Sequence, residues 1–139
     1  MEPDGMKKIR ACIGSNDGDN IAQTHMGDTE HFFIYDLFEN AENRFIENRV
    51  NAAMDMEHAK EQKMETIMGI VEDADIFVAC RKSPNFVKIA NKTRHQPVLV
   101  EARTLPEALA LLQASFQEIH GYVSRRKQGE VFGFIPELK

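Results

Sequence analysis

The chain has 139 residues, of which 42% are hydrophobic and 28% charged, and a formal net charge of −5. This length suits one domain around one core, and the ordinary globular composition excludes a disordered chain and a membrane protein. The negative charge argues against a nucleic-acid partner, because such binding needs many Lys and Arg side chains on phosphates.

The first half of the chain predicts three strands. Residues 8–14, 31–38 and 45–50 are apolar or alternating runs of strand length. The polar residues 39–43 suit the turn of an antiparallel hairpin. Residues 1–6 lack the apolar stretch of a signal peptide and predict a flexible N-terminus. We therefore expect a cytoplasmic protein, and no run of about 20 apolar residues predicts a membrane span.

A helix and a buried strand follow. Residues 57–72 predict a helix, because apolar side chains recur on one face at helical spacing, namely Met64, Ile67, Met68 and Val71. We interpret this methionine-rich stripe as core packing rather than a set of sulfur ligands. Residues 75–80 form a continuous apolar run, typical of a central strand that is covered on both faces.

Two more helices and a fifth strand complete the predicted order. Ser83 and Pro84 are residue types favoured at the N-cap and first position of a helix. Residues 97–100 predict a strand. Thr104 opens a Thr-x-x-Glu capping box, which predicts a third helix that ends at Gly121.

The order of these elements is βββαβαβα. It predicts an α/β fold with a mixed sheet of five strands and three helices, in which strands joined by helices are parallel. Residues 122–139 carry scattered apolar side chains. The pattern leaves open whether they add an edge strand, cover a groove or are mobile.

One polar loop follows the first strand and contains Ser15, Asp17 and His25. Loops at the carboxyl ends of parallel strands are where α/β sheets bind ligands. The Asp17-Gly18 pair by itself predicts only a turn. An imidazole in such a loop is accessible to solvent, so His25 can serve as a ligand or a hydrogen-bond donor.

A second candidate loop begins at Cys80, directly before the predicted second helix. A helix N-terminus favours a thiolate and would lower the pKa of Cys80. A small buried hydrophobic residue is an equally good interpretation of Cys80, and Cys12, inside the first strand, is interpreted as core. The two cysteines are in no CxxC spacing, which disfavours a disulfide framework or a structural zinc site.

Several motifs occur in the order and spacing of a known family. The first half of the chain has a Ser-x-Asp-Gly turn at residues 15–18, a His-x-Gly element at 25–27 and an aromatic strand at 33–36. The second half has an aspartate before an apolar strand at 75–78, a loop with a Pro-Asn helix start at 80–85 and a Leu-x-Glu-Ala helix at 105–109. Residues 7–121 thereby resemble the dinitrogenase iron-molybdenum cofactor biosynthesis family. The chain departs from it at Met26, where an aromatic residue is usual, and at Cys80 and Ser83, where glycines are frequent.

The resemblance implies a ribonuclease-H-like fold and non-catalytic binding or carriage of an iron–sulfur or iron-molybdenum type cofactor or its precursor. It implies that cofactor-assembly proteins are partners. His25 and Cys80 would be the metal ligands, and Arg81 and Lys82 would offset the charge of an anionic cluster. Ser15 and Asp17 complete the expected cofactor-binding set.

Two other functions stay open. A ribonuclease-H-like nuclease needs carboxylates that converge on two metal ions, and the available acids are Asp17, Asp36 and Asp75. A regulatory or protein-interaction module needs no metal at all. We predict that three histidines in or beside helices are not ligands, namely His58, His95 and His120, while His31 is left open.

Overall fold

The computed structural model describes residues 6–54 and 60–139. In chain order they form β1 (Lys8–Ser15), the short 3-10 helix η1 (Met26–Asp28), β2 (His31–Phe38), β3 (Asn43–Val50), α1 (Lys60–Ile70), β4 (Ile76–Ala79), α2 (Pro84–Lys92), β5 (Gln96–Val100), α3 (Leu105–Ala114), α4 (Phe116–Lys127) and β6 (Glu137–Leu138). The predicted α/β class is confirmed. The described residues hold six strands and four α-helices instead of five and three. His58 lies outside the described residues.

A single mixed sheet organises the fold, with strand order β3-β2-β1-β4-β5-β6. β2 pairs antiparallel with both β1 and β3, so the predicted hairpin is confirmed. β4 runs parallel to β1 and β5, and β5 runs parallel to β6. The strands joined by helices are therefore parallel, and β4 is central, as the apolar run predicted.

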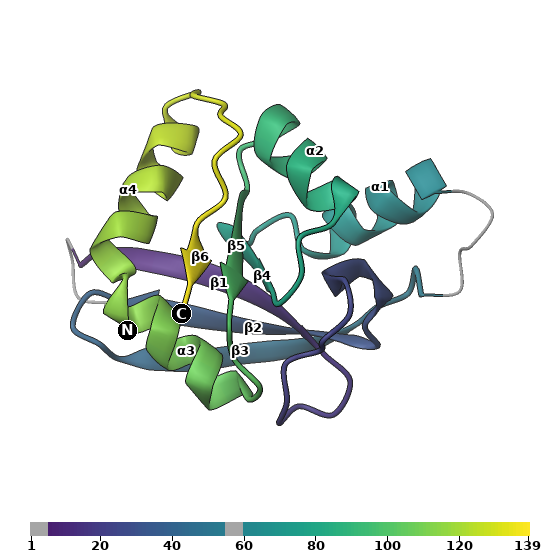
Figure 1. The fold of residues 1–139 in the computed structure, drawn as a ribbon, viewed down its shortest axis with the longest axis horizontal. Helices are drawn as coiled ribbons and strands as arrows, with labels where there is room; N and C mark the ends of the chain where they lie inside the picture. Colours follow the sequence, from purple (N-terminus) through teal and green to yellow (C-terminus); the bar gives the residue numbers. More distant parts are fainter. Residues whose placement is uncertain (1–5, 55–59) are drawn as a thin grey trace.

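Helices cover both faces of the sheet (Figure 1). On one face, α3 and α4 pack on a core that includes Ile9, Ile13 and Val78. On the other face, α1, α2 and η1 pack on a second core that includes Phe77 and the fully buried Cys12. The methionine-rich stripe of α1 belongs to this second core, which confirms its interpretation as packing.

Local capping residues begin both helices that follow the parallel strands. The Ser83 hydroxyl accepts from the Phe86 N–H at 3.1 Å at the start of α2. The Thr104 hydroxyl accepts from the Glu107 N–H at 3.2 Å at the start of α3. Both predicted N-caps are confirmed.

The prediction that a helix ends at Gly121 is wrong. The break lies at Ser115, and Gly121 is an interior residue of α4. The apolar stripe continues beyond the glycine, with Ile119 and Val123 buried against the sheet. Packing of this stripe outweighs the weak helix propensity of one glycine, which costs only about 1 kcal/mol.

Residues 122–139 add an edge strand, one of the three alternatives left open. After α4 the chain runs back along β5 and pairs with it at β6. The buried Arg126 side chain fixes this course, because its guanidinium donates to Gln96 Oε1 at 2.7 Å and to the carbonyl oxygens of Ala90 and Phe132 at 2.8 Å. Gln96 in turn donates to the carbonyl oxygen of Phe134 at 3.1 Å.

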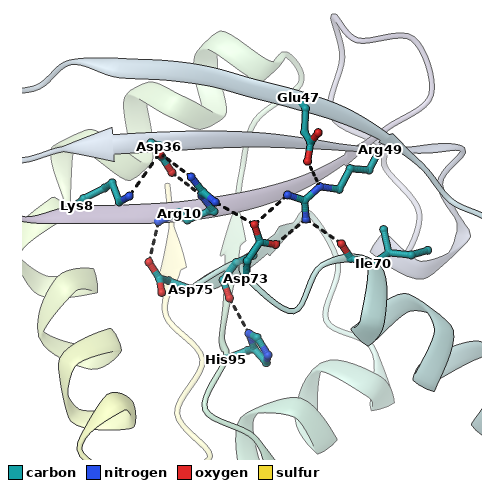
Figure 2. Close-up of polar contacts among 10 residues, drawn as sticks. Lys8, Arg10, Asp36, Glu47, Arg49, Ile70, Asp73, Asp75 and His95 are labelled. Atoms are coloured by element: carbon teal, nitrogen blue, oxygen red, sulfur yellow. Dashed lines mark hydrogen bonds and ion pairs between the residues drawn. The ribbon is translucent and has the colours of Figure 1, made fainter. Parts of the chain in front are cut away.

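Paired charges connect the turn after α1 to the sheet (Figure 2). Arg10 donates to Asp36 at 2.8 Å and to Asp73 at 2.9 Å. Arg49 donates to the other oxygen of Asp73 at 2.6 Å and to the carbonyl oxygen of Ile70 at 2.8 Å. Asp73 therefore joins β1 and β3 to the end of α1, toward the edge where β1 and β4 begin.

We predict that Arg126→Leu lowers the free energy of unfolding by about 3 kcal/mol. Several buried oxygens would lose their donor together, and each unsatisfied group costs about 1–3 kcal/mol. The neighbouring Arg125, with a half-exposed side chain, is the matched control, and Arg125→Leu should cost less than about 1 kcal/mol. Urea unfolding followed by circular dichroism measures both, and equal losses would contradict the role of Arg126.

Candidate functional site

β1, β4 and β5 end at the same edge of the sheet, so the loops after them lie together. The loop after β1 is joined most closely to the loop after β5. Asn20 forms a bridge with Thr104, and the Ile21 N–H donates to the carbonyl oxygen of Arg103 at 2.9 Å. Residues 101–103 were not predicted to belong to a site and Thr104 was predicted only as an N-cap, although their position after a parallel strand was a usable signal.

Ser15 and Asp17 shape the first loop from within. The buried Ser15 hydroxyl donates to the carbonyl oxygen of Asn20 at 2.6 Å. Asp17 accepts from the N–H groups of Asp19 and Asn20 at 2.9 and 2.8 Å. These bonds, first of all the one from Asn20, lower the pKa of Asp17 to about 2. Both side chains therefore hold the turn, and their part in cofactor binding stays a prediction.

His25 lies where the first loop crosses the edge of the sheet. Ile21 packs in the core under α3, whereas Met26 packs in the core under α1 and α2. The chain between them must pass over the strand ends, and His25 is the last residue before η1. The imidazole is exposed and has no hydrogen bond or ion pair with the described residues. It is free to bind a ligand.

The structure gives Cys80 a different environment from the one expected. Its side chain packs against the core under α3. The thiol donates to the carbonyl oxygen of Ala102 at 3.4 Å and accepts from Gln23 Nε2 at 3.5 Å. Burial raises the pKa of Cys80, so the expectation of a lowered pKa is wrong. Desolvation of the thiolate outweighs both polar contacts and the nearby helix N-terminus.

Arg81 and Lys82 follow Cys80 on the loop that leads to α2. Both are exposed, and neither has a polar partner in the described part of the chain. η1 packs beside β4, so the short helix that follows His25 lies next to the strand that leads into this basic pair. Together, His25 and the basic pair offer an imidazole and two cations.

The start of α2 offers few backbone donors to an anion. Pro84 has no N–H, the Phe86 N–H is bound by the Ser83 hydroxyl, and the Val87 N–H is bound by the Ser83 carbonyl. Only the Asn85 N–H is left in the first turn. An anion at the start of α2 would therefore meet few free backbone donors, and side chains must carry most of the positive charge.

An open pocket of about 500 Å³ lies on the α3 side of the edge. Gln23 and Cys80 line it, and charged side chains of both signs surround it, namely Glu101, Arg103, Glu107, Glu137 and Lys139. His25, Arg81 and Lys82 are not among its lining residues. With three acidic and two basic residues, the pocket has no excess of positive charge for an anionic cluster.

The carboxylates considered for nuclease chemistry do not converge. Asp17 is bound by its own loop, Asp36 by Arg10, and Asp75 by the N–H of Arg10 and by Lys127. Across residues 6–54 and 60–139, no three His, Cys, Asp or Glu side chains are grouped to hold a metal ion.

The remaining described histidines lie in three different places. His95, before β5, bonds through Nδ1 to the carbonyl oxygen of Ala74 at 2.7 Å (Figure 2). His120 stacks on Phe116 within α4. His31 is paired with Ser15 across β1 and β2, and its Nδ1 is buried without a partner in the described structure.

A family model described as dinitrogenase iron-molybdenum cofactor matches residues 7–115 of the chain. No curated protein matches it. The matched region includes every candidate loop of the carboxyl edge and ends at the break between α3 and α4. Within the described residues, no helix has the length and apolar character that a membrane span requires.

We predict that iodoacetamide alkylates Cys80 slowly at pH 7 and faster as the pH rises, because its raised pKa keeps the thiol protonated at neutral pH. Cys12 is fully buried and should react only after unfolding. Peptide mass spectrometry after timed labelling measures both rates. Alkylation of Cys80 at pH 7 as fast as that of a low-pKa thiol would contradict the assigned environment.

Proposed function

Since the chain belongs to the dinitrogenase iron-molybdenum cofactor family, we propose that it binds and carries a metal–sulfur cluster at the carboxyl edge of its sheet. The cargo is an iron–sulfur or iron-molybdenum type cofactor or a precursor of one. The role is carriage without catalysis, in the cytoplasm, between proteins that assemble the cofactor and proteins that use it.

The observation that carries this proposal is the position of His25. The imidazole is exposed, has no polar partner among the described residues, and directly precedes η1 within the region that the family model matches. A neutral imidazole is a good ligand for iron, because its ring nitrogen offers a lone pair to the metal.

Electrostatics supports an anionic cargo at this position. Arg81 and Lys82 have no carboxylate partner among the described residues, so their charge is available to a ligand. A metal–sulfide cluster with thiolate ligands is an anion. Its charge would be met by the two flexible cations and by the one unused N–H of α2, that of Asn85.

The test uses a synthetic [4Fe–4S] cluster with four thiolate ligands and charge 2− as probe. We predict that His25→Ala lowers the affinity of the protein for this probe about tenfold or more, because the ligand that replaces a thiolate is lost. Arg81→Ala together with Lys82→Ala should lower it about fivefold, since two exposed charge contacts are together worth about 1 kcal/mol. Anaerobic absorption titration measures both.

A matched control separates this site from general surface charge. Lys88→Ala with Lys92→Ala removes the same two charges from exposed positions of α2 and should leave the affinity within about twofold. Equal losses in both double variants would contradict a local site. No binding of the probe by the wild-type protein would instead favour the metal-free interaction module.

A further inference from the structure

Gln23 joins the loop that carries His25 to the two neighbouring loops of the edge. Its Nε2 group lies 3.3 Å from the carbonyl oxygen of Ala102, 3.3 Å from that of Ile21 and 3.5 Å from Cys80 Sγ. One side-chain amide therefore contacts the loop after β4, the loop after β5 and its own loop.

This amide is the last anchor before the imidazole. The preceding residues are bound by their backbone, with the Ile21 N–H on the carbonyl oxygen of Arg103 and the Ala22 N–H on that of Gly14. Beyond His25 the chain is held by Met26, which is buried in the other core. Gln23, Thr24 and His25 are all exposed, and only Thr24 separates the anchored Gln23 from His25, so a shift at Gln23 reaches His25 directly.

The thiol of Cys80 is one of the polar groups that Gln23 contacts. Its thiol donates to the carbonyl oxygen of Ala102, which also accepts from Gln23. The thiol therefore takes part in a closed set of polar contacts on the α3 side of the edge. Met26, the anchor after His25, packs on the opposite face of the sheet.

We propose that Gln23 is a positioning residue that holds His25 in place for the cluster. We call its contacts with Cys80 and Ala102 the latch, and we infer that Cys80 acts in this latch rather than as a metal ligand. The inference rests on the proposed function, because it concerns the same site. The inference assigns a positioning role to Gln23. It assigns Cys80 a supporting role that the protonated thiol can perform.

The first experiment compares Gln23→Met, which keeps the length of the side chain but removes the donor, with Gln128→Met at an exposed position of the C-terminal region. Affinity for the synthetic [4Fe–4S] probe should fall about tenfold in Gln23→Met, the effect of losing an outer-shell contact, and stay unchanged in the control. The melting temperature should move by less than about 2 °C in both, because Gln23 lies outside the core.

The second experiment separates latch from ligand at Cys80. Cys80→Ser keeps a donor for Ala102 and an acceptor for Gln23, so it should bind the probe within about twofold of wild type, whereas Cys80→Ala should bind a few-fold more weakly. A metal ligand would give a different pattern, because the serine and alanine variants would both lose most of the affinity. That result would overturn the inference.

Backbone ¹⁵N relaxation of the cluster-free protein provides a readout that does not depend on cargo. Order parameters at Thr24 and His25 should fall in Gln23→Met and stay at wild-type values in Gln128→Met. Unchanged order parameters would overturn the latch. If His25→Ala binds the probe as wild type does, the proposed function fails, and the relaxation data still decide whether Gln23 fixes the loop.

Discussion

The second half of the structure depends on the hydrogen bonds that the buried guanidinium of Arg126 donates. In the part of the chain that the structure describes the guanidinium has no carboxylate partner, and it is satisfied by oxygens from the end of α2, the start of β5 and the segment after α4. Burial lowers the pKa of Arg126, but a guanidinium stays charged in proteins. Because these oxygens come from three segments, one side chain fixes α4 against the sheet and directs the C-terminal segment toward β5. The position of β6 beside the carboxyl edge follows from that course.

The two cores then determine what the edge can present. Successive residues of a strand point to opposite faces, so Cys80 continues the α3 face of β4, while the loop after β1 passes from that face to the other between Ile21 and Met26. His25 stands at this crossing. This alternation therefore leaves the imidazole of His25 at the strand ends. It directs the thiol of Cys80 toward the α3 face, where the thiol contacts Ala102 and Gln23.

Local signals predicted much of this arrangement, and contacts between distant segments account for the rest. The N-caps Ser83 and Thr104 and the apolar run of β4 act within a few residues, so the sequence alone revealed them. β6 has two residues and depends on Arg126 and Gln96, which no local pattern near residue 137 reveals. The same holds at the site. His25 could be proposed as a ligand from its loop alone, but the thiol pKa of Cys80 depends on burial and on Ala102, and the contacts of Gln23 arise because three loops meet at its amide.

Few side chains and backbone N–H groups at the carboxyl edge are available to bind a cluster. This small number suits transient carriage of a cluster, as proposed, better than its permanent storage. The first turn of α3 is also occupied, since the Leu105 N–H bonds to the carbonyl oxygen of Asp19, residue 106 is a proline and the Glu107 N–H bonds to Thr104. Neither helix that begins at this edge therefore presents the set of free N–H groups that binds phosphates in many α/β proteins. Under the proposed function, the imidazole of His25 and the exposed cations of Arg81 and Lys82 would give a modest affinity that is sensitive to salt. Such a site would take up a finished anionic cluster that keeps most of its own ligands, and it would release that cluster to a partner that offers a further ligand.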